Sequence, residues 1–233
     1  MTDLLEYRVA EGVATITMDD GKANALSHAM IGAVDAALDR AVSDARALVL
    51  AGRDGRFSAG FDLSVMQAGP EAARDLVAAG GRLCMKIYTL PLPVVVACTG
   101  HALAAGALLL LSGDWRVGGE GDFKIGLNEV SIGLPLPQFA IDLAAARLDV
   151  RQLTRATALA HIYDSAGAVE AGYLDVLAAD PLAEATTVAA ELAGRLSAFG
   201  FAGTRRTARQ ALADAVLTGI EADLIHFDLD PEA

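Results

Sequence analysis

Positively charged residues are scarce in this sequence. Its 233 residues include 18 Lys and Arg against 30 Asp and Glu, which gives a formal net charge of −12. Broad binding to nucleic acid or to an anionic membrane surface needs basic side chains, so the composition argues against both kinds of partner. A phosphorylated ligand is not excluded, because a few local Lys or Arg residues suffice to hold one.

Cysteines are equally few. Cys84 and Cys98 lie in apolar surroundings and have no metal-like spacing. The N-terminal segment MTDLLEYRVAEG carries acidic residues early and has no apolar stretch of the kind found in secretory signals. Disulfides form mainly in exported proteins, so we expect two reduced thiols in the core of a cytoplasmic protein.

Charged residues are absent between Tyr88 and Gly113, a stretch long enough to cross a membrane as a helix. Pro91 and Pro93 prevent a helix at its start, and the sequence TGH at 99–101 interrupts its middle. We therefore expect no membrane partner. The stretch predicts a short buried strand, VVVAC, followed by a turn and an apolar helix.

Common motifs for metals, phosphates and nucleophilic serines are also missing. The sequence has neither GxSxG nor GxxxxGK[ST]. Its histidines show no pairing at metal-ligand spacing, so we expect no metal site. They are His28, His101, His161 and His226.

The order of the apolar patterns predicts an α/β fold, with strands mostly in the first half and helices gathered at the end. No repeat or flexible linker divides the chain. We expect one continuous fold with a core at 1–197 and a C-terminal helical region at 198–233. The expected strands are a pair around 11–12, then 47–52 and 94–98, with a hairpin around 118–121; the expected helices are 27–42, 70–88, 139–147, 151–160, 166–171, 182–197 and 203–225.

Three irregular segments follow strand-like stretches and are the candidate site. FSAGFDL (57–63) follows ALVLAG, GHALAAGA (100–107) follows VVVAC, and GLNEVSIG (126–133) follows FKI. Their small residues let a ligand approach the main chain, and loops at one edge of a parallel sheet are common binding sites. Two of the segments lead into helices, so their backbone N–H groups are available to an anion.

These segments suggest a specific chemistry. N–H groups of Ala59 and Ala105 aimed at one carbonyl oxygen would form an oxyanion hole for an enolate. Glu129 lies in an apolar setting that would raise its pKa toward the range useful for moving a proton next to a carbonyl. On the residues alone another interpretation stays open, in which Glu129 caps a turn and the small residues only permit packing.

Five segments, in order along nearly the whole chain, resemble the enoyl-CoA hydratase/isomerase (crotonase) superfamily. They are VATITMDDGKANALS, FSAGFDL, PVVVACTGHALAAGALLLLSGDWRV, IGLNEVSIGLPLP and SAGAVEAGYLDVL. The resemblance implies a spiral of ββα units, with a C-terminal helical region that builds homotrimers or hexamers. It also implies an acyl-CoA thioester substrate, whose coenzyme A is part of the substrate, and no separate cofactor.

The resemblance implies Ala59 and Ala105 as the two oxyanion donors, although the second position is usually glycine in the family. It also places a set of residues around the CoA arm of the substrate. These are Lys22, Ala23, Ala25, Leu26, Ala59, Gly60, Phe61, Asp62, Ala105 and Gly106.

The choice of reaction depends on two positions. Hydratases of this family resemble one another in using two glutamates, and here Leu108 stands at the first position and Glu129 at the second. Mitochondrial-type Δ3,Δ2-enoyl-CoA isomerases resemble this chain more closely, because they too have an apolar residue at the first position and a single glutamate in GLNE. The resemblance therefore favours an isomerase.

Two alternatives remain beside the isomerase. One is an enoyl-CoA hydratase of fatty-acid oxidation, for which Asp62 is the nearest candidate for the missing acid, although a helix N-cap is its more ordinary role. The other is a non-catalytic acyl-CoA-binding protein. Met66, Met85 and Phe139 are candidates to shape the acyl pocket, or else ordinary core residues.

Overall fold

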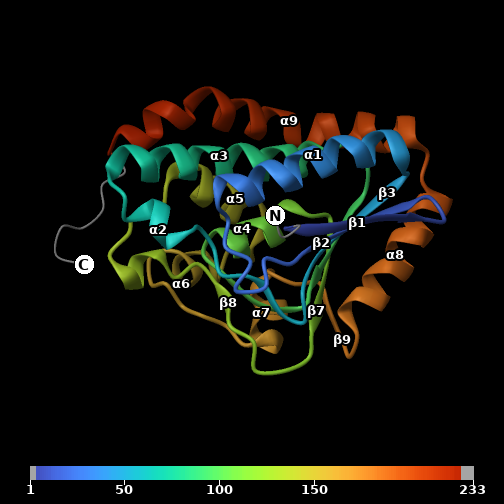
Figure 1. The fold of residues 1–233 in the computed structure, drawn as a ribbon, viewed down its shortest axis with the longest axis horizontal. Helices are drawn as coiled ribbons and strands as arrows, with labels where there is room; N and C mark the ends of the chain where they lie inside the picture. The colour runs from blue at the N-terminus through green and yellow to red at the C-terminus, as the bar shows by residue number, and fades with distance from the viewer. Residues whose placement is uncertain (1–3, 227–233) are drawn as a thin grey trace.

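Two mostly parallel sheets organise the chain, of which the computed structural model describes residues 4–226 (Figure 1). In the larger sheet β1 is antiparallel to β2 and all other neighbours are parallel; the smaller sheet is parallel throughout. The larger sheet has the order β1 (Leu5–Ala10), β2 (Val13–Met18), β3 (Ala47–Gly52), β5 (Val94–Cys98), β7 (Trp115–Gly119) and β9 (Val176–Ala178), and the smaller sheet the order β4 (Gly55–Ser58), β6 (Gly100–Leu103) and β8 (Ile125–Gly126).

The helices alternate with these strands and then fill the C-terminal part. They are α1 (His28–Asp44), α2 (Leu63–Met66), α3 (Pro70–Thr89), α4 (Ala105–Ser112), the 3₁₀ helix η1 (Glu129–Ile132), α5 (Gln138–Arg147), α6 (Leu153–Ala156), α7 (Ser165–Ala171), α8 (Pro181–Arg195), α9 (Ala198–Asp223) and the 3₁₀ helix η2 (Leu224–His226).

A repeated ββα unit produces the two sheets. Each of three consecutive segments gives one strand to the larger sheet, the next to the smaller sheet, and then a helix: β3, β4 and α3; β5, β6 and α4; β7, β8 and α5. Because neighbouring strands from successive units are parallel, the chain advances as a spiral. This confirms the predicted fold class.

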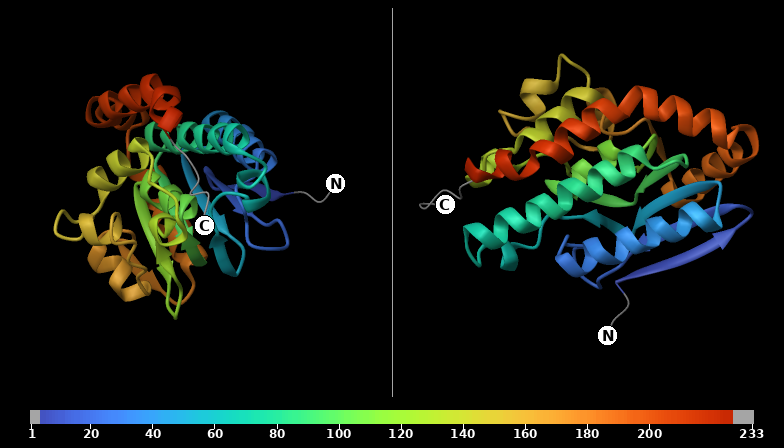
Figure 2. Two further views of the ribbon diagram at one scale, coloured as in Figure 1. Left: turned by 90° about the vertical axis from the view of Figure 1, so that its left-hand side faces the viewer. Right: turned by 90° about the horizontal axis from the view of Figure 1, so that it is seen from above.

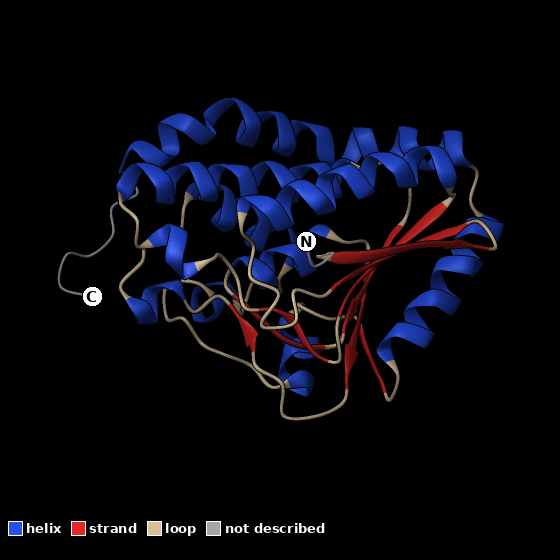
Figure 3. Ribbon diagram, in the orientation of Figure 1, coloured by secondary structure: helices blue, strands red, loops and turns tan. Residues whose placement is uncertain are grey.

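Helices cover both faces of the larger sheet (Figures 1 and 3). Leu48 and Leu50, on one face of β3, belong to the core shared with α1 and α3, whereas Val49 on the other face packs with Ala189 of α8. Burial on both faces explains why 47–52 is an unbroken apolar run. Helices α1, α3 and α9 lie side by side along one side of the molecule (Figure 2).

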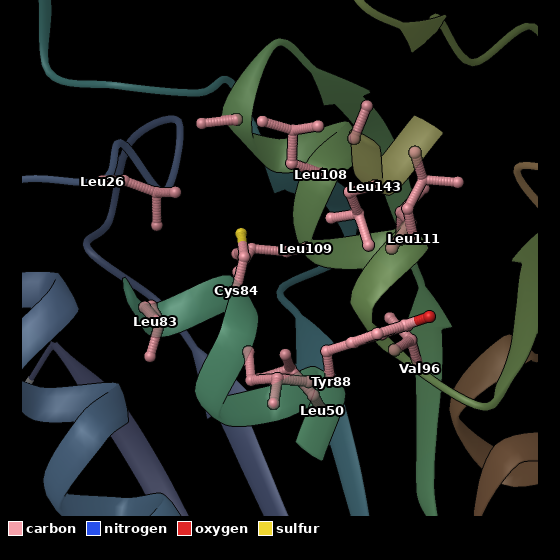
Figure 4. Close-up of a cluster of buried hydrophobic side chains, with 14 of the residues drawn as sticks. Leu26, Leu50, Leu83, Cys84, Tyr88, Val96, Leu108, Leu109, Leu111 and Leu143 are labelled. Atoms are coloured by element: carbon pink, nitrogen blue, oxygen red, sulfur yellow. The ribbon is translucent and has the colours of Figure 1, made fainter. Parts of the chain in front are cut away.

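The apolar stretch after β5 contains the predicted buried helix, α4, but the predicted turn before it is the short strand β6. All four leucines of α4 are buried, and Leu109 lies beside Cys84 of α3 (Figure 4). A helix that is apolar all round belongs in a core. Over residues 4–226, no helix has the length and apolar character needed to cross a membrane. Cys84 and Cys98 are buried free thiols, and burial raises the pKa of each to about 12.

The hairpin predicted around 118–121 is wrong. β7 pairs in parallel with β5 and β9, whereas β8 pairs with β6 in the smaller sheet. The two glycines differ in what they provide: a Cβ on Gly119 would lie 3.2 Å from the Phe123 ring, whereas Gly121 has φ of +139°, which side chains rarely adopt. The segment between β7 and β8 therefore crosses from one sheet to the other.

Other differences concern short elements. The segment 53–64, expected as a loop, contains β4 and the start of the one-turn helix α2, while the helix expected at 151–160 is reduced to α6. Helix α9 starts at Ala198, where the Ser197 hydroxyl accepts a hydrogen bond from the N–H of Gly200 (3.3 Å). Of the predicted region 198–233, the last residues, 227–233, lie outside the described part of the chain.

Candidate active site

A cavity of about 440 Å³ opens where the three predicted segments meet. Nearly all of its wall is apolar. The residues that line it are Ala23, Ala25, Ala59, Phe61, Leu63, Met66, Val77, Ala104, Leu108, Asn128, Glu129, Ile132, Leu134, Pro137 and Phe139. Leu63 and Ile132 are exposed, which places them at its opening.

The two predicted oxyanion donors differ in their hydrogen bonding. Ala105 is the first residue of α4, and its N–H has no protein acceptor within residues 4–226. The N–H of Ala59 donates to the carbonyl oxygen of Ala23 at 3.0 Å. A ligand oxygen held by both donors must therefore share the Ala59 N–H with Ala23 or displace that carbonyl. Catalytic hydrogen bonds are often incomplete before substrate binds.

Close backbone packing brings the two donor segments together. Gly60 has φ of +94°, and a Cβ there would lie 2.8 Å from the Ala104 methyl group and 3.3 Å from the Ala105 nitrogen. Only glycine fits this position, because a side chain would be strained in φ and would also fill the space between the donors. Gly106 is tightly packed as well, with Ser58 where its Cβ would be.

Ala104 stores strain beside the donors. It is a non-glycine residue with φ of +50° and ψ of −127° at the start of α4. We expect Ala104→Gly to stabilise the protein by roughly 1 kcal/mol, because glycine adopts this conformation without strain. The measurement is the free energy of unfolding in urea. Ala107→Gly, inside the same helix, is the control and should destabilise; a loss of stability in both variants would contradict the strain.

Glu129 is the first residue of η1 and reaches the cavity from the third segment. Its side chain is buried, with 8% of the residue exposed, and its Oε2 has no hydrogen-bond partner among the described residues. Burial raises the pKa of this carboxyl from its usual 4.5 to about 7. The group can therefore be present as acid or as base near neutral pH, as a proton shuttle requires.

Glu129 is the one ionisable side chain that lines the cavity within residues 4–226. Leu108 lines the same cavity and is 1% exposed. Asp62 caps α2 by accepting a hydrogen bond from the Ser64 N–H (2.9 Å), as the sequence suggested. Its hydrogen bonds with the hydroxyl and N–H of Ser64 hold the pKa of Asp62 below its usual value. A second acid of the kind that a hydratase uses is therefore lacking in this part of the chain.

The residues predicted for the CoA arm separate into two groups. Ala23, Ala25, Ala59 and Phe61 line the cavity. The others do not line it. Lys22 is exposed and its carbonyl accepts hydrogen bonds from Arg53, and the Leu26 side chain is fully buried in the core. Gly60, Asp62, Ala105 and Gly106 are likewise outside the set of lining residues.

Two residues that the sequence did not single out hold the 20–26 loop in place. Asn24 is fully buried with φ of +51°, and its amide donates to the carbonyl oxygens of Met18 (2.9 Å) and Phe57 (3.2 Å). Asp20 accepts hydrogen bonds from the N–H groups of Lys22 (2.7 Å) and Asn24 (2.9 Å). An Asp and an Asn within a short glycine-containing loop are the signal that predicts such turns.

Asn128 is the other polar residue that sequence reasoning left without a role. It lines the cavity next to Glu129, and its Oδ1 is buried without a hydrogen-bond partner among residues 4–226. Its position directly before Glu129 in GLNE is the signal that could have found it. Of the three pocket candidates, Met66 and Phe139 line the cavity, whereas Met85 is fully buried in the core. No cluster of three potential metal ligands occurs in the described part of the chain.

The chain belongs to the enoyl-CoA hydratase/isomerase family, whose sequence model matches residues 8–227. An enoyl-CoA hydratase/isomerase family protein from Pseudomonas syringae has a similar crystal structure, with 39% sequence identity and a TM-score of 0.93. The match covers 97% of this chain and 99% of that chain. The two-sheet spiral is therefore the crotonase fold.

Curated relatives carry two kinds of name. A protein of Bacillus subtilis named "Probable enoyl-CoA hydratase" is 33% identical over 140 residues, which are 58% of this chain and 54% of the relative. The human "Enoyl-CoA delta isomerase 1, mitochondrial" is 27% identical over 231 residues, which are 96% of this chain and 76% of the relative. The chain spans about half the length of the first of these, and the names divide between hydratase and isomerase.

Proposed function

We propose that the chain isomerises enoyl-CoA thioesters, moving a double bond from C3 to C2 of the acyl group with Glu129 as the proton shuttle. The observation that carries the proposal is which side chains line the cavity: one buried carboxylate, Glu129, and the buried Leu108 in the same apolar wall. An isomerisation takes up and returns a single proton, so one carboxylate suffices.

The proposed steps use three groups. Glu129 removes a proton from C2, and the electron pair of that C–H bond passes into a dienolate whose oxygen is held by the N–H groups of Ala59 and Ala105. The same carboxyl then returns the proton at C4, which leaves the double bond between C2 and C3. A pKa of about 7 favours both transfers, since neither protonation state is strongly preferred near neutral pH.

Hydration of 2-enoyl-CoA is the second candidate. Asn128 favours it, because this residue lines the cavity beside Glu129 and its buried Oδ1, which has no partner among the described residues, is able to accept a hydrogen bond. An amide cannot replace a second acid or base, so a hydratase with this inventory would lose one acid/base contribution, roughly a hundred-fold to ten-thousand-fold in rate.

The proposal includes the substrate class and the assembly. An acyl-CoA thioester is the substrate, coenzyme A enters as part of it, and no further cofactor is required for the steps above. A homotrimer or hexamer is the assembly that the family resemblance supports.

A panel of 3-enoyl-CoA and 2-enoyl-CoA substrates of several acyl lengths tests the function. We expect conversion of 3-enoyl-CoA to 2-enoyl-CoA to be at least about a hundred-fold faster than hydration, because one carboxylate serves only the first reaction fully. Faster hydration would establish the hydratase. Tight binding of acyl-CoA by calorimetry without any turnover would establish a non-catalytic binding protein.

A further inference from the structure

Two adjacent glycines lie in the middle of α3, at Gly80 and Gly81. Glycine is unfavourable inside a helix relative to alanine. Neither residue has a positive φ, so the backbone does not require glycine at these positions. Both are buried. The reason for the pair must lie in what packs against this part of α3.

Two aromatic rings of the cavity wall pack there. A Cβ on Gly80 would overlap the Phe61 ring at Cε1 and Cζ. A Cβ on Gly81 would lie 3.2 Å from Cε1 of Phe139, and 2.6 Å from Cδ1 of Ile220. Phe61 comes from the β4–α2 connection and Phe139 from α5, so segments far apart in the sequence meet at one point of α3.

Both rings line the cavity that holds Glu129. Val77, one turn before Gly80 on α3, lines it as well, so this helix forms the support of that wall. The missing side chains at 80 and 81 let the rings withdraw toward α3 and leave the cavity wide. Glu129 lines the same cavity, and its Oε2 is buried without a hydrogen-bond partner among the described residues, so this cavity is the candidate ligand site.

We propose that Gly80 and Gly81 determine acyl-chain specificity, by setting how far the rings of Phe61 and Phe139 extend into the acyl pocket. They act through the two rings and are positioning residues, because neither lines the cavity itself. The inference rests on the proposed function only in taking the ligand to be an acyl-CoA, and it holds for isomerase, hydratase and non-catalytic binder alike.

An added methyl group should have a larger effect at position 80 than at position 81. At Gly80 the obstacle is the body of an aromatic ring, which must move as a whole when a methyl group is added. At Gly81 the closest atom is the end of the Ile220 side chain, which is flexible, and the Phe139 ring needs to give by only a few tenths of an ångström. Gly80→Ala should therefore narrow the pocket more than Gly81→Ala.

The test measures binding of saturated acyl-CoA by calorimetry, with butanoyl-, octanoyl- and dodecanoyl-CoA. We expect Gly80→Ala to weaken binding of the longest acyl-CoA that the wild type accepts by about ten-fold or more. One methylene in an apolar pocket changes discrimination between ligands by about 10–200-fold. Butanoyl-CoA should change by less than about two-fold. The double variant Gly80→Ala/Phe61→Leu should bind the long-chain acyl-CoA as the wild type does, because leucine at position 61 makes room for the new methyl group.

Gly32→Ala is the matched control. Gly32 lies in α1, and beyond its own stretch of helix no described atom lies within 4 Å of the position of its Cβ, so alanine there raises helix propensity in the same way without contacting a ring. It should leave the binding profile unchanged. An equal loss for all chain lengths in Gly80→Ala, or no recovery in the double variant, would overturn the proposal.

A crystal structure of Gly80→Ala gives a result that needs no ligand. We expect the Phe61 ring displaced toward the cavity while the course of α3 is unchanged. A shifted α3 with Phe61 in its original place would contradict the inference. If the wild type binds no acyl-CoA at all, the proposed function fails, whereas the position of the ring still decides whether these glycines set the shape of the cavity.

Discussion

Glu129→Gln is expected to lower turnover of an enoyl-CoA substrate by roughly a hundred-fold to ten-thousand-fold while acyl-CoA binding stays nearly unchanged. The amide keeps the shape of the side chain in its buried position but cannot accept the C2 proton. Because Glu129 is the one ionisable group lining the cavity within residues 4–226, no neighbour there can replace it. The measurements are kcat and KM for the enoyl-CoA, and Kd for a saturated acyl-CoA.

The pH dependence of the wild type should identify the same group. The base must be ionised to remove a proton, so kcat/KM is expected to rise with pH through about 7, the value to which burial raises the Glu129 pKa. The residual rate of Glu129→Gln should lack this rise. Glu191→Gln, an exposed change on α8, is the control and should keep both the rate and the profile. A Gln variant as active as the wild type would exclude Glu129 as the shuttle.

The same substitution should stabilise the protein at alkaline pH. The folded-state pKa of Glu129, about 7, lies above its usual 4.5, so the folded protein holds this proton more tightly than the unfolded chain. The neutral group is therefore tolerated at low pH, and stability is lost as pH rises between these two values. Since a tenfold change in proton affinity corresponds to about 1.36 kcal/mol, the loss above the folded-state pKa amounts to about 3 kcal/mol.

Unfolding in urea on both sides of this window measures the effect. At about pH 8 we expect Glu129→Gln to be more stable than the wild type by up to about 3 kcal/mol, and at about pH 4 the two should be nearly equal. A more active but less stable wild type is the signature of a buried catalytic carboxylate. An equal stability difference at both pH values would mean that burial does not raise this pKa.

The order of the main elements could be predicted because each carries a long periodic pattern. The strand at 47–52 and the helix at 70–88 both emerge close to their expected positions, as β3 and α3. The smaller sheet could not be predicted, because β4, β6 and β8 have only two to four residues each and their pairing is entirely between distant segments. A period of two is not recognisable over so few residues.

In the candidate site, too, local features could be predicted from the sequence, whereas contacts between distant segments could not. The position of Glu129 in an apolar segment predicted its burial and its raised pKa. The bond from the Ala59 N–H to Ala23 could not be predicted, because it joins two loops 36 positions apart by backbone atoms that carry no sequence signal. The support of Phe61 by Gly80 is likewise a contact between distant segments, and a glycine inside a helix indicates that something packs closely there without saying what.

Asp114→Ala is expected to cost about 3–5 kcal/mol of stability, which is a large part of the total for a domain of this kind. Asp114 lies between α4 and β7 and pairs with Arg205 and with Arg209 (3.0 Å), both on α9. Its Oδ2 also accepts a hydrogen bond from the N–H of Val94 in β5 (2.7 Å). Arg205 in turn donates to the Leu90 and Leu92 carbonyl oxygens, so one carboxylate joins α9 to the start of β5.

The expected cost comes from the arginines left behind. The side chain of Arg205 is 3% exposed and that of Arg209 13% exposed, so removing the carboxylate leaves two cations with little access to water. Glu221→Ala is the matched control, since it removes another ion pair of α9, to Arg82 on α3, in which both side chains are well exposed. That change should cost at most about 1 kcal/mol. Urea unfolding followed by circular dichroism compares the two variants, and equal costs would contradict an anchoring role for Asp114.

The shape of the Asp114→Ala transition also bears on how α9 belongs to the fold. Because the carboxylate contacts both α9 and the start of β5, its loss weakens the helix and the sheet together. We therefore expect one cooperative transition, shifted to lower urea, with near-ultraviolet and far-ultraviolet signals changing together. Early loss of part of the far-ultraviolet signal, with the sheet intact, would mean that α9 unfolds as a separate unit. In that case the ion pairs would attach α9 to the rest of the protein, but α9 would not share its cooperative unfolding transition.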